Sequence, residues 1–416
     1  MKKLTYKSTI SACYLGYITQ AIVVNFMPIL FAVFQDKFKI SFSALGSLIL
    51  LNFVTQILVD MVGARYVDKI GFRRAIVPAH IFAAAGLISL GTLPQILPSP
   101  YLGLVISVII FSFGGGLIEV VISPVVDAIP SDDSSAAMSL LHSFYCWGQL
   151  AVVLLTTLAL KILGHDSWTL LAIAWAIVPV FGIICFMHVP LPPTVLGERQ
   201  PLRELFRARV FLLGMLLMTC AGAAEQTMAQ WASLFAQKGL MVSKVVGDLL
   251  GPCLFALFMA VGRVFFGMKG EKLNIHKSLL ISSVLCVVCY LTAVFSKNAF
   301  ISLLACALTG FTVALMWPGT LSYMSATFPQ GGAAMFGVMA IFGDVGCSAG
   351  PWLAGLVSDG FQKLPETVSL AEKSGFGIEQ LGLKAGIFVG IIFPILMIWG
   401  LIALGKRKNQ KKPLTN

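Results

Sequence analysis

The chain has 416 residues, of which 58% are hydrophobic and only 11% are charged, against about 25% charged residues in soluble domains. So few charges cannot cover a globule of this size in water, which excludes an ordinary soluble protein. The net charge of +11 comes from basic residues between long apolar runs. This placement favours a membrane over nucleic acid as the partner. All nine cysteines fall in apolar segments, so we expect no disulfide framework.

Twelve apolar segments are long enough to cross a bilayer as helices, because about 20 apolar residues span its core. Lipid cannot satisfy an open backbone, so each crossing segment must be helical. The sequence therefore predicts an all-α membrane protein. The expected spans are 8–34, 42–66, 73–96, 101–128, 135–163, 167–188, 208–236, 243–268, 276–296, 299–327, 333–358 and 383–405.

Basic residues orient the spans. The first apolar run is too long for a signal peptide, so it is expected to stay as a span. With the N-terminus in the cytoplasm, 20 of the 29 Lys and Arg residues fall on the cytoplasmic side, which predicts that both termini are cytoplasmic. Short loops and the absence of an Asn-x-Ser/Thr sequon are typical of a bacterial inner membrane, the expected location.

The connection between spans two and three carries a charged motif. It reads Gly-x-x-x-x-Asp-x-x-Gly-x-Arg-Arg, from Gly63 to Arg74, and resembles the signature of the major facilitator superfamily. That resemblance implies two pseudo-symmetric bundles of six helices. It also implies a gating role for the motif, which would tie cytoplasmic helix ends together. The gating residues are then Gly63, Asp68, Gly71, Arg73 and Arg74.

Acids inside a lipid-spanning helix are costly and mark functional sites. Glu119 in span four and His142 in span five are expected at one depth, where they could share a proton; a static hydrogen-bonded pair is the alternative. Asp344 in span eleven is a possible ligand contact or a structural hydrogen bond. Asp60, low in span two, is expected to belong with the cytoplasmic charges.

Span seven holds the polar row Glu225, Gln226 and Gln230 beside Trp231. Amides that hydrogen-bond to hydroxyl groups beside an aromatic face suit a sugar-like ligand. The alternative is that these side chains form hydrogen bonds between helices. Asn25 in span one is the nearest counterpart. The break at Trp317-Pro318 in span ten is either a cavity aromatic or a simple kink.

Weak self-similarity at an offset near 199 residues indicates duplicated halves. Val62-Gly63 recurs as Val261-Gly262, and Pro130 recurs as Pro329. Transporters built from such repeats place the substrate near the midplane between the halves. The sequence predicts an N-terminal bundle over 1–189, a cytoplasmic linker over 190–207 and a C-terminal bundle over 208–416.

Several segments resemble the fucose permease-like branch of the superfamily: Gly114 to Pro124, Leu141 to Gly148, Glu225 with Trp231, and Gly350-Pro351. The resemblance implies sugar transport and adds Tyr145, with Gln149 as a further possibility, to the contact residues. Fucose-type proton symporters also carry an acid in helix one, where this chain has Val24-Asn25-Phe26. Coupling would therefore fall on Glu119, with His142.

These observations predict a secondary active transporter, not an enzyme. It would move a monosaccharide or related sugar by alternating access with proton symport. The expected chain is monomeric in the bilayer, with no metal, no cofactor and no nucleic acid partner. The alternatives are a drug, lipid or metabolite exporter of the same fold, and a sodium-coupled or uniport sugar carrier. A membrane-embedded enzyme is disfavoured because no catalytic cluster stands out.

Overall fold

The computed structural model describes residues 4–129, 134–193, 202–269, 274–328 and 332–410. Within them, twelve helices are long and apolar enough to cross a membrane, and no strand occurs. Each agrees with a predicted span to within a few residues at most ends. The predicted all-α membrane fold is confirmed.

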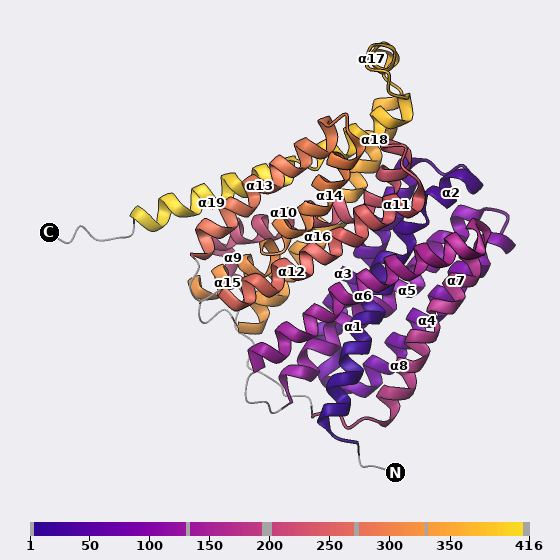
Figure 1. The fold of residues 1–416 in the computed structure, drawn as a ribbon. Helices are drawn as coiled ribbons and strands as arrows, with labels where there is room; N and C mark the ends of the chain where they lie inside the picture. The colour runs from indigo at the N-terminus through magenta and orange to yellow at the C-terminus, as the bar shows by residue number, and fades with distance from the viewer. Residues whose placement is uncertain (1–3, 130–133, 194–201, 270–273, 329–331, 411–416) are drawn as a thin grey trace.

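The N-terminal half supplies six spans (Figure 1). They are α1 (Tyr6–Ile29), α3 (Phe42–Ile70), α4 (Phe72–Ile96), α5 (Pro100–Asp127), α6 (Ser134–Leu163) and the pair α7 (Trp168–Trp175) with α8 (Ile177–His188). A short helix, α2 (Phe31–Phe38), follows α1. The predicted domain boundaries stay predictions, and α9 (Leu202–Arg207) lies within the expected linker.

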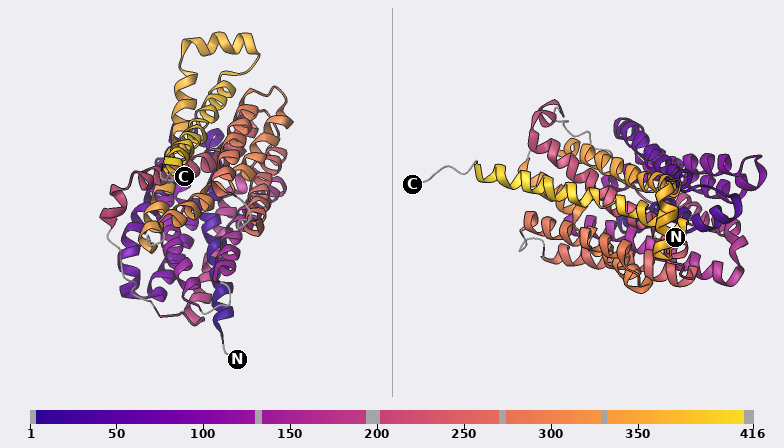
Figure 2. Two further views of the ribbon diagram at one scale, coloured as in Figure 1. Left: turned by 90° about the vertical axis from the view of Figure 1, so that its left-hand side faces the viewer. Right: turned by 90° about the horizontal axis from the view of Figure 1, so that it is seen from above.

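The C-terminal half supplies the other six. They are α10 (Arg209–Leu234), α11 (Lys244–Asp248) with α12 (Leu254–Lys269), α13 (Ile275–Phe295), α14 (Ala299–Val313) with α15 (Met316–Thr327), α16 (Gly332–Gln362), and α18 (Ile378–Val389) with α19 (Ile392–Gln410). A short helix, α17 (Pro365–Ser374), stands off the bundle, as Figure 2 shows.

The connection between α3 and α4 is tighter than the predicted loop. Helix α3 continues to Ile70, and Gly71 alone joins it to α4 with φ at 87°, a left-handed conformation that favours glycine. Gly63 lies inside α3, where an added Cβ would sit 3.2 Å from Val120. Gly262, expected in the corresponding loop of the second half, likewise lies inside α12 and packs against Ala314.

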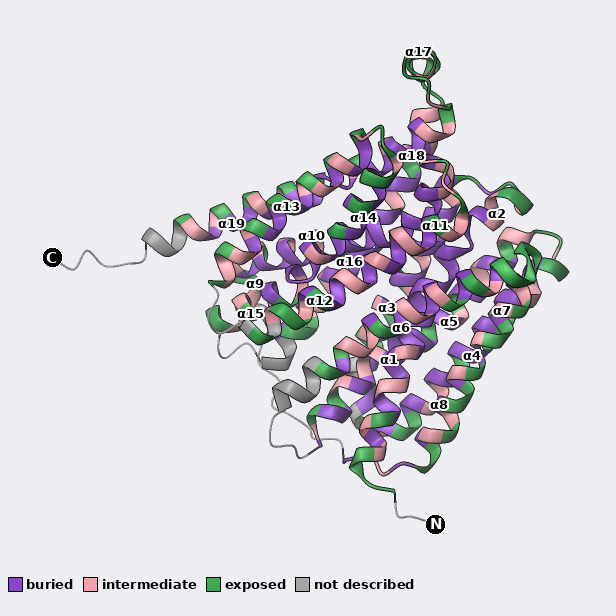
Figure 3. Cartoon of the chain, viewed as in Figure 1, coloured by how far each residue is buried: buried purple, intermediate pink, exposed green. Residues whose placement is uncertain are grey.

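Many large apolar residues are exposed and a set of polar ones is buried, as expected for lipid contact; Figure 3 shows how buried and exposed residues are distributed over the helices. Leu58, Ile109, Ile281 and Trp399 are exposed large hydrophobics, whereas Gln56, Gln230 and Asp248 are buried. In water such a surface would be an interaction or aggregation patch. In a bilayer it is the face that meets the acyl chains.

Twelve crossings place both termini on one side of the membrane, here called the terminal side; the opposite side is called the far side. The ribbons of the two bundles lie together near α2, α11 and α18 and separate toward α8 and α15 (Figure 1). On the far side, both backbone amides Phe42 N and Ser43 N at the start of α3 donate to Asp359 of α16, at 3.1 and 2.7 Å. A carboxylate at a helix N-terminus satisfies orphan donors and the helix dipole. These contacts hold the far side closed.

Gly355 makes this closed junction possible. A Cβ there would lie 2.5 Å from the carbonyl oxygen of Phe42 and 3.2 Å from the Trp231 indole. We predict that Gly355→Val destabilises the protein by about 1–3 kcal/mol through overpacking, seen as a lower thermal unfolding temperature. Gly360→Val is the matched control in the same helix, because nothing lies within 4 Å of its Cβ position. Equal unfolding temperatures for the two variants would contradict the assignment.

Candidate functional site

A central polar cluster joins helices of both halves. In α1, Asn25 donates from Nδ2 to the Tyr145 hydroxyl of α6 at 3.1 Å and to the Ala21 carbonyl at 3.0 Å. Tyr145 in turn interacts electrostatically with Glu225 of α10. The structure therefore brings together three sequence-predicted contact residues from three helices.

Helix α10 contributes a hydrogen-bonded row to this cluster. Gln230 donates to Gln226 at 2.8 Å, and Gln226 donates to Glu225 at 3.2 Å. Gln230 also reaches the Val24 carbonyl of α1 at 3.5 Å, across the boundary between the halves. All three side chains are buried. The row can present amide donors and acceptors to a hydroxyl-rich solute.

Arg263 completes the cluster and was not predicted, since it was counted among the cytoplasmic loop residues. It lies in α12, and its Nη2 is 3.7 Å from Glu225 Oε2. Its Nη1 donates to the Cys146 sulfur of α6 at 3.3 Å. The position follows Gly262 near the end of an apolar run, where a sequence cannot tell a loop arginine from one that turns inward.

Glu119 lies in a second polar group, built in the N-terminal half. Gln20 of α1 donates to Glu119 Oε2 at 3.2 Å and to Gln56 of α3 at 2.7 Å. Gln56 and Ser112 both donate to Asn52 at 2.7 Å. This chain of amides fixes the Glu119 carboxyl at the junction of three helices. The amides were not predicted, although polar residues inside spans one and two signalled them.

The expected direct contact between Glu119 and His142 is not among the hydrogen bonds of the described residues. The ring of Tyr17 instead meets His142 edge-on at a centroid distance of 5.2 Å. The Tyr17 hydroxyl is 2.9 Å from the Ser123 hydroxyl, and Tyr17 interacts electrostatically with Glu119. His142 is exposed. Proton exchange between Glu119 and His142 would therefore pass through Tyr17 or water.

Besides Glu119, two further acids carry a buried carboxyl oxygen that has no hydrogen-bond partner among the described residues. One is Asp344 of α16, which is 94% buried with Oδ2 unpartnered. The other is Asp60 of α3, whose buried Oδ1 also has no partner. Asp60 therefore faces the interior, contrary to its expected place among the cytoplasmic charges. The three carboxyls come from both halves of the protein.

The two candidate tryptophans lie outside the polar cluster. Trp231 is 1% exposed, donates to the Pro351 carbonyl at 3.0 Å and meets the rings of Phe31 and Phe42 edge-on. It packs the far-side junction in this conformation, and its contact with a sugar stays a prediction. Trp317 covers Gly343 just after the break between α14 and α15.

Gln149 lies closer to the cluster. It is buried, its Oε1 has no hydrogen-bond partner, and it lines a small cavity with Asn25. The cavity also touches Ala229 and Ser233 of α10. The contact of Gln149 with a solute stays a prediction.

The predicted gating residues occupy one end of the N-terminal bundle. Arg73 donates to the carbonyls of Phe186 at 2.8 Å, of Met187, and of Val189 at 2.7 Å, so it caps the end of α8. Arg74 is exposed. The side chain of Asp68 lies outside the described residues. The contacts of Arg73 tie helix ends within one half rather than between halves.

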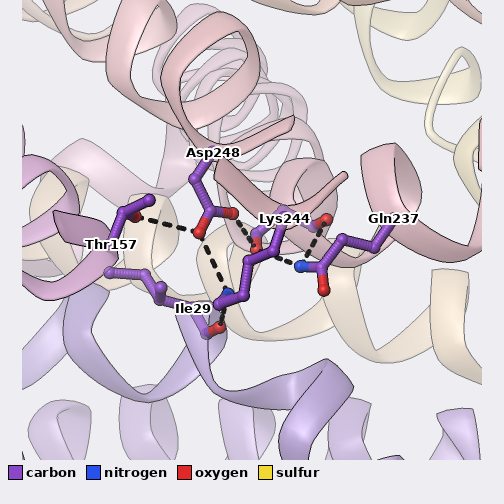
Figure 4. A network of polar contacts seen from close by, with 6 residues as sticks. Ile29, Thr157, Gln237, Lys244 and Asp248 are labelled. Atoms are coloured by element: carbon purple, nitrogen blue, oxygen red, sulfur yellow. Dashed lines mark hydrogen bonds and ion pairs between the residues drawn. The ribbon is translucent and has the colours of Figure 1, made fainter. Parts of the chain in front are cut away.

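The far side carries a buried ion pair that sequence reasoning missed (Figure 4). Asp248 is fully buried and lies 3.0 Å from Lys244 Nζ. It also accepts from Thr157 of α6 at 2.9 Å and from Ser233 of α10 at 2.5 Å. Lys244 donates to the Ile29 carbonyl of α1 at 2.7 Å. Both halves are thus joined through two buried charges.

A family model described as "Major Facilitator Superfamily" matches residues 13–351. This chain is a member of that superfamily. It is thus a multi-pass membrane transporter, and the two-bundle architecture of this superfamily is the one seen here. A search of curated protein sequences finds no match.

Solved structures of other superfamily members share the fold. The nucleoside transporter NupG, as a point variant, superposes with a TM-score of 0.74 at 12% identity, covering 95% of this chain and 99% of that one. An inward-facing bacterial homologue of the human lysosomal transporter Spinster gives 0.73 at 14%, covering 96% and 97%. The fucose:proton symporter FucP of E. coli, also a point variant, gives 0.63 at 14%, covering 95% and 98%. At these identities the likeness concerns the fold alone.

Proposed function

We propose that this superfamily member is a proton-coupled symporter for a monosaccharide or related sugar. The observation that carries the proposal is the central polar cluster: Asn25, Tyr145, Glu225, Gln226 and Gln230 converge from α1, α6 and α10. Such buried amides and hydroxyls match the hydroxyls of a sugar. Drugs and lipids would bind better in an apolar cavity.

Glu119 is the proposed proton carrier. Its carboxyl accepts a hydrogen bond from Gln20 at the junction of three helices, a setting in which a proton can bind and leave as the halves rock. His142, exposed and linked through Tyr17, would pass the proton to water. Sodium coupling and uniport are the rival mechanisms.

The proposed orientation places the terminal side in the cytoplasm, because most basic residues flank the spans there. We further propose a bacterial inner membrane as the location, a monomer as the working unit, no metal or cofactor, and no nucleic acid partner. In alternating access, the far side would open as the terminal side closes around Asp68 and Arg73.

The direct test is uptake into proteoliposomes from a panel of sugars, with and without an imposed pH or sodium gradient. The proposal predicts saturable uptake of at least one sugar and its acceleration by an inward proton gradient. Uptake of apolar drugs or lipids with no sugar uptake would contradict it. Acceleration by sodium alone would contradict the proton assignment.

The gate has its own prediction. Asp68→Asn should reduce transport at least about tenfold while substrate binding stays measurable, because the lost charge weakens the terminal-side closure and not the ligand site. Binding is read by ligand-induced thermal stabilisation and transport by initial uptake rate. Normal transport by this variant would remove Asp68 from the gate.

A further inference from the structure

The most unusual group in the central cluster is the Arg263 guanidinium, because its partners in the described residues are weak. Its nearest carboxylate oxygen, on Glu225, is 3.7 Å away, whereas a charge-assisted N–H···O bond is about 2.7–2.9 Å long. Its hydrogen bond goes to the Cys146 sulfur at 3.3 Å, and sulfur is a weak acceptor. Its Nε is buried with no partner.

An arginine near the end of a span ordinarily extends toward the headgroups. Arg263 does not: its side chain is 23% exposed and turns inward, toward Glu225 of α10 and Cys146 of α6. The guanidinium therefore stands between the halves, next to Glu225 at the start of the amide row, with about a quarter of its side chain (23%) exposed.

A guanidinium presents five N–H donors in a planar fork, which matches a carboxylate through two parallel hydrogen bonds. Charges inside a membrane protein need such partners. Because the contact with Glu225 is long and Nε has no partner, N–H donors of the guanidinium are available to a second oxyanion. Groups that can bind hydroxyls contact the partners of Arg263 or their neighbours: Gln226 donates to Glu225, and Asn25 donates to Tyr145, which precedes Cys146.

We infer that the solute is a hydroxylated carboxylate, such as a sugar acid, whose carboxylate binds Arg263 and displaces Glu225. This inference rests on the proposed sugar transport and names its substrate class. The hydroxyls of the solute contact the amide row, and its carboxylate takes the place of the Glu225 carboxylate at the guanidinium. A phosphate ester carries the same oxyanion chemistry with up to two charges, for which this cluster offers one cation.

Three probes that share the same sugar ring test the assignment: D-glucose, D-glucuronate and D-glucose 6-phosphate. Binding is measured by ligand-induced thermal stabilisation of the purified full chain, and transport by uptake into proteoliposomes. The inference predicts that glucuronate binds at least about tenfold more tightly than glucose, since hydrogen bonds to charged groups contribute that much. Tighter binding of glucose, or of glucose 6-phosphate, than of glucuronate would overturn it.

Substitutions of Arg263 provide the second part of the test. Arg263→Gln should abolish the preference for glucuronate over glucose, and Arg263→Lys should keep only part of it, because an ammonium lacks the planar fork. Arg209→Gln, at an exposed position at the start of α10, is the matched control and should keep the full preference. Equal loss of glucose and glucuronate binding in Arg263→Gln would refute the inference.

If Arg263→Gln does not fold, glucuronate binding by Glu225→Gln tests the inference instead. Removing the competing carboxylate should tighten glucuronate binding several-fold, and weaker glucuronate binding would overturn the displacement. The inference and the proposed function fail in different ways. Proton-driven uptake of glucose without discrimination of glucuronate overturns the inference alone, whereas the absence of any sugar or sugar-acid uptake overturns both.

Discussion

Replacing Asp248 with asparagine should lower the thermal unfolding temperature of the protein by at least about 5 °C, because it leaves Lys244 buried without its counter-ion. The pair is 8% and 0% exposed, and breaking a buried pair on one side costs about 3–5 kcal/mol. The same network joins α1 and α6 to α10 and α11. The loss should therefore also weaken the closure of the far side.

Two controls separate the buried pair from charge loss in general. Asp166→Asn removes the partner of Lys37 in an exposed far-side pair, with side chains 93% and 37% exposed. Its effect should stay below about 1 kcal/mol. The double change Lys244→Met with Asp248→Leu removes both charges, and should recover much of the lost stability. A thiol-reactive dye reports unfolding, since most of the nine cysteines are buried. Equal unfolding temperatures for Asp248→Asn and Asp166→Asn would contradict the account.

Replacing Glu119 with glutamine should abolish sugar accumulation driven by a proton gradient while counterflow exchange continues. Glutamine keeps the shape and a hydrogen bond to Gln20 but cannot carry a proton. A pH gradient equivalent to 100 mV supplies about 2.3 kcal/mol per proton, enough for roughly a 50-fold solute gradient when the membrane potential is zero. Accumulation should therefore fall from tens-fold to about equal concentrations inside and outside.

The control for Glu119→Gln is Glu366→Gln, at an exposed position of α17, which should accumulate the solute normally. Asp344→Asn tests the rival coupling site, since Asp344 is a buried acid of the other half with an unpartnered carboxyl oxygen. Accumulation that survives in Glu119→Gln and is lost in Asp344→Asn would move the coupling site to Asp344.

The spans could be predicted from the sequence because lipid leaves a polypeptide few choices: long apolar runs had to be helices. The repeat indicated how they would be grouped. What hydropathy does not encode is the exact place of a turn. The α3–α4 connection looked like a charged loop, yet helix geometry accommodates the charges and only Gly71 turns the chain.

The site was harder to predict because the sequence gives the depth of a polar residue in the membrane but not the direction in which its side chain points. Asn25 and Glu225 were found by their rarity in apolar runs, and the structure brings them near Tyr145. Arg263 and Asp248 were missed because they lie near predicted helix ends, where charges usually meet water. The burial of Trp231 against Phe42 could not be predicted, because it depends on contacts between halves that are distant in sequence.

The central claim is that a sugar-like solute and a proton move together, and simultaneous measurement of both tests it most directly. Proteoliposomes with equal pH inside and outside would receive a transported solute while an external electrode records pH. The account predicts alkalinisation of the medium that saturates with solute concentration and disappears in Glu119→Gln. Solute uptake by the wild-type protein with no change in external pH would contradict it.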